Sequence, residues 1–208
     1  MAIDHYGKIV GPDLFLPTHA VGRLSFPLFA AIVGIRLAAR PDLASRYFGR
    51  LLPWALVSQP AFVLAGRPWH AGNILFTLLL GVGLTAWLRR AAAARSTWPE
   101  AVVVVLASPL ALFVEFGLVG VAAVPIIAAL AARHRTAALW AAGPLGVAAN
   151  LTRELPPLSW VDLCALGSSV VLAGSVALKP RLPRLPTHAF YAFYPLHLLA
   201  LHFYDLYG

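Results

Sequence analysis

The sequence predicts an all-α protein, a polytopic bundle of transmembrane helices with eight full spans plus a short N-terminal helix. The chain is 60% hydrophobic and only 12% charged, whereas a soluble domain carries about 25% charged residues. Its apolar runs are long and continuous and lack the alternation of an outer-membrane barrel. A chain of 208 residues with this composition cannot cover its apolar surface in water. We therefore expect a single membrane domain over residues 1–208.

The basic residues support the same fold and predict its orientation. The chain has 16 Lys and Arg against 8 Asp and Glu, which gives a net charge of +8. Most of the basic residues gather between alternate apolar runs, as the positive-inside rule requires of cytoplasmic loops. We therefore expect a multi-pass protein with its N-terminus in the cytoplasm, and no nucleic-acid partner. The basic stretches are residues 36–50, 89–95, 133–135 and 179–184.

The first half of the chain is expected to hold a short helix and three full spans. The short helix covers about Ala2–Val10 and ends before Gly11-Pro12-Asp13. It falls short of the roughly 20 residues that a full span needs. Pro27 stands in the first turns of the next span, where a missing N–H is best tolerated. The three spans are Gly22–Ala39, Tyr47–Ala65 and Gly72–Leu88.

The second half is expected to hold five more spans. The stretch Trp98–His134 contains too many apolar residues for one span, and we expect two spans broken near Glu115-Phe116-Gly117. Pro156-Pro157 marks a turn, and the stretch Lys179–Pro186 is a loop. The remaining spans are Ala137–Leu151, Trp160–Leu178 and Thr187–Tyr204.

A few polar side chains lie in or near these spans rather than in the basic loops. Placing an Asp at the centre of a membrane helix costs about 2.5–3.5 kcal/mol on insertion scales. Such residues persist only where they pair, face the bundle interior or take part in chemistry. They are Asp4, His5, Arg23, Asn73, Glu115, His197 and His202.

Each of these residues also has a structural interpretation. Asn73 begins a span and is a good helix N-cap. Arg23 either pairs with a carboxylate, binds an anion or extends to the headgroups. Glu115 either caps a tight turn before Gly117 or faces the interior. Asp4 is alternatively a helix cap in the headgroup region.

The histidines differ in their position within the spans. His197 lies well inside the last span, after Tyr194-Pro195, and we favour a functional role for it. His202 is about 140° away around the same helix, and we expect packing or an interfacial position. His5 is either functional or interfacial. Its neighbour Asp4 points about 100° away, so we expect any carboxylate that orients His5 to come from another helix.

Together these residues supply a histidine base, a carboxylate to orient it and an arginine for developing negative charge. They suit a proton relay in a transporter just as well. The sequence has no phosphate-binding glycine loop, no His/Cys metal spacing and no serine elbow. No metal is therefore expected.

Five short motifs occur in order along nearly the whole chain. They are Ile3-Asp4-His5-Tyr6-Gly7, Gly22 to Ala30 (GRLSFPLFA), Asn73 to Gly81 (NILFTLLLG), Glu115-Phe116-Gly117, and Phe193 to Leu198 (FYPLHL). With these motifs the chain resembles the TraX family, membrane proteins associated with conjugative pilus systems and with N-terminal acetylation of pilin. More distantly it resembles the integral-membrane acyltransferases. It departs from the family in carrying fewer residues before the Asp-His pair and Phe116 in place of a tyrosine.

The resemblance implies an enzyme of the bacterial inner membrane, a membrane-bound acetyltransferase. Its co-substrate would be acetyl-CoA, and its acceptor an amine or hydroxyl on pilin, a glycan or another molecule. The rival hypotheses are a small-solute or proton-coupled transporter and a non-catalytic pilus-assembly protein.

The resemblance also implies roles for single residues. His5 or His197 would deprotonate the acceptor, and Asp4 would fix a histidine tautomer or pair with Arg23, as would Glu115. Arg23 and Asn73 would stabilise the oxyanion or hold the phosphates of the donor. Tyr194 would contribute to the same substrate-binding site.

Overall fold

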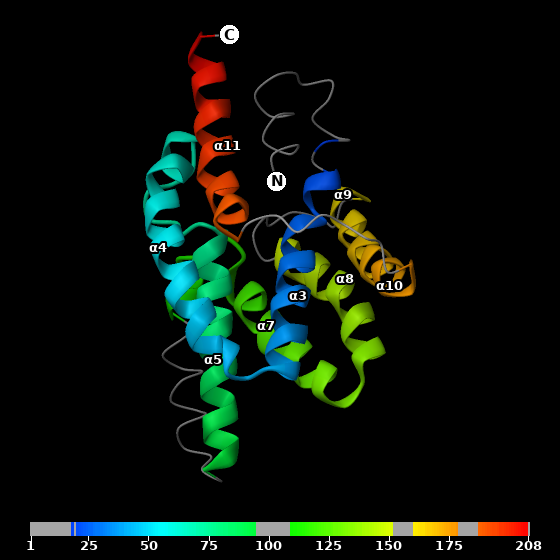
Figure 1. Ribbon diagram of the computed structural model, residues 1–208. Coiled ribbons are helices and arrows are strands. Elements are labelled where there is room, and N and C mark those ends of the chain that lie inside the picture. Colours follow the sequence, from blue (N-terminus) through cyan, green and yellow to red (C-terminus); the bar gives the residue numbers. More distant parts are fainter. Residues whose placement is uncertain (1–17, 19, 95–108, 152–159, 179–186, 208) are drawn as a thin grey trace.

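The computed structural model describes residues 18, 20–94, 109–151, 160–178 and 187–207, and these residues form an all-α bundle (Figure 1). The only β-pairing among the described residues is an isolated bridge between Gly72 and Val114. The predicted all-α fold is therefore confirmed. The helices are α3 (Ser25–Ala39), α4 (Leu43–Leu64), α5 (Ile74–Ala93), α7 (Gly117–Arg133), α8 (Arg135–Leu151), α9 (Trp160–Leu163), a 3-10 helix (Cys164–Leu166), α10 (Gly167–Leu178) and α11 (Thr187–Tyr207).

Most of these helices lie where the apolar runs predict them. α4 begins at Leu43 rather than Tyr47, and α5 continues to Ala93 rather than Leu88. The predicted span Trp160–Leu178 is divided into α9, the 3-10 helix and α10. The short first helix and residues 98–108 lie outside the described residues.

The predicted count of eight full spans is not confirmed. Among the described residues, two helical segments are long and apolar enough to cross a membrane, Ala20–Ala39 and Ile74–Ala93. α7 and α8 have 17 residues each. At 1.5 Å per residue they are about 26 Å long, shorter than the roughly 30 Å of hydrocarbon in a bilayer.

α7 is the central helix, and α3 and α5 pack against it on two sides (Figure 1). Glycines permit both approaches. A Cβ atom on Gly34 of α3 would lie 2.9 Å from the Val124 carbonyl oxygen, and one on Gly81 of α5 would lie 2.8 Å from Val124 Cγ2. Small residues let helix backbones come this close. α3 and α5 therefore both pack closely against the turn of α7 that contains Val124.

The turns that precede α5 and α7 are joined by backbone hydrogen bonds. Gly72 N–H donates to the Phe113 carbonyl at 2.5 Å, and Glu115 N–H donates to the Gly72 carbonyl at 2.9 Å. The chain then enters α7 through Gly117 with φ of 57°, a left-handed conformation that glycine adopts without strain. The predicted break at Glu115-Phe116-Gly117 is thus present.

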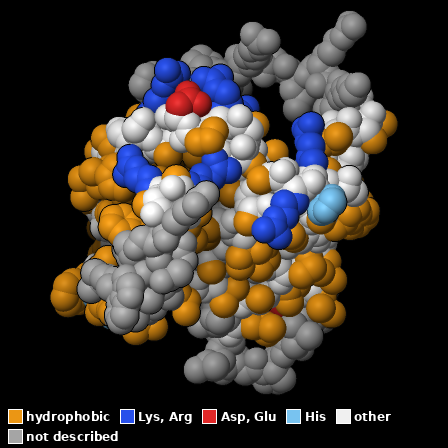
Figure 2. All heavy atoms as spheres, turned by 90° about the horizontal axis from the view of Figure 1, so that it is seen from below, with side chains coloured by type: hydrophobic (Ala, Val, Ile, Leu, Met, Phe, Trp, Pro, Cys, Tyr) orange, Lys and Arg blue, Asp and Glu red, His pale blue; other side chains and the backbone are white. Residues whose placement is uncertain are grey.

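The described basic stretches all lie at one end of the bundle. Residues 36–50 cover the turn between α3 and α4. α5 runs antiparallel to α4, because Asn73 before its first residue bonds Gln59 near the end of α4. α8 likewise runs antiparallel to α3, because Asn150 bonds Arg23. Residues 89–90 and 133–135 therefore reach the same end, where Figure 2 shows basic side chains around an otherwise largely apolar surface.

Candidate functional site

A pocket of about 600 Å³ lies between α3, α4, α5 and α11. α3 contributes Ser25, Phe29, Ile32 and Arg36, whose spacing places them on one face of the helix. Ser25 and Arg36 are eleven positions apart, which corresponds to about 16 Å along the axis. The pocket therefore extends along most of α3.

The walls of the pocket are mainly apolar, and its polar groups lie in two places. Ile74, Leu75 and Leu78 of α5 form part of the apolar lining. At the basic end of the bundle the lining includes three exposed arginines, Arg36, Arg46 and Arg50. Farther along, the polar lining residues are Ser25, Tyr194 and His197.

α11 runs away from the basic end of the bundle (Figure 1). Its Tyr191 lies near Arg36 and Arg50 and stacks on Trp54 of α4 with ring centroids 6.3 Å apart. His197 is six residues later, about 9 Å farther along the helix. The histidine thus lies farther from the basic end than the arginines do.

The His197 side chain is oriented by its own helix. Its Nδ1 lies 2.8 Å from the backbone carbonyl oxygen of Phe193. Because a carbonyl oxygen only accepts hydrogen bonds, Nδ1 carries the hydrogen and Nε2 carries the lone pair. The ring stacks on Phe193, with centroids 5.0 Å apart, and meets Tyr194 edge-on at 5.5 Å. The imidazole is therefore held in the tautomer that a general base requires.

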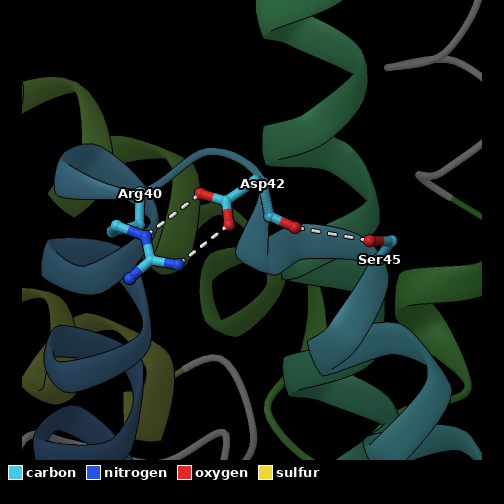
Figure 3. Close-up of polar contacts among 3 residues, drawn as sticks. All are labelled: Arg40, Asp42 and Ser45. Atoms are coloured by element: carbon cyan, nitrogen blue, oxygen red, sulfur yellow. Dashed lines mark hydrogen bonds and ion pairs between the residues drawn. The ribbon is translucent and has the colours of Figure 1, made fainter.

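Arg40 and Asp42 form an ion pair in the turn between α3 and α4 (Figure 3). Arg40 Nε and Nη2 donate to the two oxygens of Asp42 at 3.2 and 3.1 Å. These hydrogen bonds hold the pKa of the Asp42 carboxyl below its usual value, and the carboxylate raises the pKa of Arg40. Asp42 is therefore charged and bound to Arg40.

Arg23 is buried at the other end of the bundle, with only 6% of its surface exposed. Its Nη1 donates to Asn150 Oδ1 at 3.2 Å, and its Nη2 lies 3.4 Å from Asp162 Oδ1. Asp162 and Asn150 were not among the candidate residues, although Asp162 is a lone acid in an apolar run, as Glu115 is. The sequence criterion applied to Glu115 would have found it.

Asn73 is the N-cap of α5, as its structural interpretation predicted. Its Oδ1 accepts from Leu75 N–H at 3.0 Å. Its Nδ2 donates to the Ala55 carbonyl and to Gln59 Oε1, both at 2.9 Å. The fully buried amide thus connects α4 to the start of α5, and the pocket lining includes its neighbours Ile74 and Leu75 rather than Asn73.

Glu115 is partly buried in the turn before α7. The next residue, Phe116, stacks on Phe26 of α3 with ring centroids 4.1 Å apart. The bridge between Gly72 and Val114 places Asn73 beside the same turn. The structure therefore brings Asn73 and Glu115 to one region, next to the start of α3.

The other candidate residues are placed as follows. Asp4 and His5 lie outside the described residues. His202 is half-buried on α11 and is absent from the pocket lining. No group of three or more His, Cys, Asp or Glu side chains that could hold a metal ion occurs within the described ranges.

Comparisons with known proteins identify the family of this chain. Residues 1–204 match the family model described as TraX protein. Similar relatives include Protein TraX of Escherichia coli strain K12 and Protein TraX of Escherichia coli, each 33% identical over 109 residues. That alignment covers 51% of this chain and 41% of each relative. No solved structure matches. The match over nearly its whole length shows that the chain belongs to the TraX family.

Proposed function

We propose that this protein is an integral-membrane acyltransferase that transfers acetyl from acetyl-CoA to an amine or hydroxyl acceptor. The observation that carries the proposal is His197, whose Nδ1 is fixed to the Phe193 carbonyl at 2.8 Å. The residue lines a long pocket with apolar walls and a basic end. A histidine in the Nε2-basic tautomer inside such a pocket suits general-base catalysis better than packing alone.

In the proposed reaction His197 Nε2 accepts the proton of the acceptor N–H or O–H group. The acceptor then attacks the thioester carbonyl carbon of acetyl-CoA. As the C–S bond breaks, the thiolate takes the proton back from the imidazolium, giving the acetylated acceptor and CoA. Tyr194, which contacts the imidazole ring edge-on, helps to fix the ring at this position.

The other candidate residues have different supporting roles. Arg23, with Asn150 and Asp162, stabilises the start of α3, two residues before Ser25 of the pocket. Asn73 and Glu115 support the turns beside it. Asp4 and His5 remain sequence predictions for the same site. The family resemblance favours the N-terminus of pilin as acceptor, in a conjugative system of the bacterial inner membrane.

The test is substitution of His197 with His202 as a matched control on the same helix. Purified His197→Ala and His202→Ala are compared with the unaltered protein by acceptor-dependent release of CoA thiol, with pilin peptide as acceptor. Loss of a general base lowers the rate by about 10²- to 10⁴-fold. We expect that loss in His197→Ala, and a change of less than about twofold in His202→Ala.

Acetyl-CoA binding and the thermal unfolding temperature are measured on the same samples. If His197→Ala turns over at the normal rate while folded, the base is another residue. If the unaltered protein binds acetyl-CoA without releasing thiol with any amine or hydroxyl acceptor, the enzyme proposal is wrong.

A further inference from the structure

Three of the arginines at the basic end of the bundle also line the pocket. Arg36, Arg46 and Arg50 all line the pocket, although Arg90 and Arg133 supply basic charge at the same end without lining it. Arg46 and Arg50 are four residues apart and lie on the face of α4 that also presents Tyr47 and Leu51 to the pocket. Three like charges at one end of the pocket repel each other, and an anion bound between them would offset this repulsion.

The nearby carboxylate of Asp42 interacts electrostatically with Arg46, but it forms no ion pair with any of these three arginines. Asp42 is bound by two hydrogen bonds to Arg40, which does not line the pocket. Among the described residues, no ion pair involves Arg36, Arg46 or Arg50. All three arginines are exposed residues, and guanidinium groups bind phosphate oxygens through two parallel hydrogen bonds.

From this arrangement we infer that Arg36, Arg46 and Arg50 form a phosphate-binding subsite for the acyl donor. The inference rests on the proposed function, and it assigns recognition of the phosphates to these residues rather than to Arg23 and Asn73. Arg23 and Asn73 lie at the far end of the helices and are engaged in buried contacts.

The dimensions of the pocket restrict the class of ligand. Arg36 and Ser25 are separated by about 16 Å along one face of α3, and the walls between them are mainly apolar. A fitting ligand has a phosphorylated head, a long narrow arm and its reacting carbon at the far end, near His197. A CoA thioester has this form, because its pantetheine arm separates the pyrophosphate from the sulfur. A phospholipid shares the phosphate and the long arm, and the test has to separate these two sources.

The first experiment measures the affinity of the purified full chain, in a neutral detergent, for CoA and for pantetheine, which lacks the nucleotide phosphates. One charge-assisted hydrogen-bonding group contributes about tenfold or more to affinity. We expect Arg36→Ala, Arg46→Ala and Arg50→Ala each to weaken CoA binding by about tenfold. We expect the controls Arg90→Ala and Arg133→Ala to stay within about twofold.

Comparing pantetheine with CoA tests whether the three arginines bind phosphate or only shape the pocket. We expect its weaker binding to be equal in all variants, which also shows that each variant is folded around an intact pocket. Equal loss of CoA binding in variants and controls would contradict the inference. So would parallel losses for CoA and pantetheine, since the arginines would then shape the pocket without contacting phosphate.

The source of the phosphate is tested by adding phosphatidylglycerol to the micelles. We expect CoA affinity to fall by less than about threefold, because the added lipid screens the exposed arginines. Complete displacement of CoA from the three arginines would assign the subsite to lipid and overturn the inference.

The proposed function and the phosphate subsite fail in different ways. His197→Ala should keep CoA binding and lose transfer, whereas Arg46→Ala should raise the KM for acetyl-CoA and keep kcat. Arginine-dependent CoA binding without any transfer would reject the enzyme and leave the subsite standing.

Discussion

At the scale of single residues, His197 and Asn73 differ in how their polar atoms are used. The Nδ1 atom of His197 lies 2.8 Å from a backbone carbonyl of its own helix, and this contact fixes the tautomer of the ring. The Asn73 amide uses its oxygen and both of its hydrogens within the bundle. The first arrangement suits a reacting group, and the second suits a structural one.

This difference predicts that Asn73→Ala lowers stability rather than donor affinity. Losing a helix cap and leaving buried partners unsatisfied costs about 2–4 kcal/mol. Asn73→Ser keeps a capping oxygen but loses the donors to Ala55 and Gln59, so it should lose less. Thermal unfolding in detergent checks the order of the two variants. A normal unfolding temperature together with lost acetyl-CoA binding in Asn73→Ala would instead make Asn73 a ligand of the donor.

The sequence identified some of the buried polar residues and missed others of the same kind. Arg23, Asn73 and His197 are buried polar residues in apolar runs, and that contrast is visible in the sequence. Asp162 and Asn150 are buried polar residues as well, but their pairing with Arg23 was not predictable, because they come from helices more than a hundred residues away. Pairing across the bundle depends on packing, which one sequence without structure does not contain.

At the scale of helices, Pro144 of α8 and Ser169 of α10 explain how these two helices pack together. Pro144 lacks an N–H, so the Trp140 carbonyl loses its helical donor. The Ser169 hydroxyl of α10 donates to that carbonyl at 2.9 Å and accepts from Gly143 N–H at 2.9 Å. A neighbouring side chain thus satisfies the backbone that proline leaves open. The helix positions were predictable from apolar runs, whereas this pairing and the 3-10 break before α10 depend on tertiary contacts.

Two glycines of α5 should respond in opposite directions to the same substitution. In Gly81→Ala the new Cβ would lie 2.8 Å from Val124 Cγ2 and 3.0 Å from the Val121 carbonyl oxygen of α7. We expect a loss of about 1–3 kcal/mol from overpacking. Gly83 has nothing within 4 Å of the same position, so Gly83→Ala should gain about 0.5–1 kcal/mol through helix propensity. Parallel unfolding measurements check both, and equal effects would mean that α5 does not pack on α7 through Gly81.

At the scale of the whole molecule, the pocket follows α3 and reaches the end of the bundle where the basic residues gather. The α3–α4 turn, the end of α5 and the α7–α8 turn bring their arginines to one end of the bundle. Three of them, Arg36, Arg46 and Arg50, line the pocket at that end. The sequence predicted the basic loops as a sign of orientation. It did not predict that three of these arginines belong to a pocket, because the lining comes from four helices that span most of the chain.

The basic residues at one end of the bundle predict that this end faces the cytoplasm. α4 has 22 residues and is about 33 Å long, so Ser45 near its start and Trp69 beyond its end lie at opposite ends of the bundle. Trp69 is 80% exposed, and Ser45 is exposed in the basic turn. Each is replaced by cysteine in a Cys164→Ser background and treated with a membrane-impermeant maleimide. Trp69→Cys should react in cells whose inner membrane is intact, and Ser45→Cys only in inverted vesicles. Labelling of both from one side would show that α4 does not cross the membrane. The reverse pattern would place the arginine-lined end of the pocket outside, where cytoplasmic acetyl-CoA does not reach it.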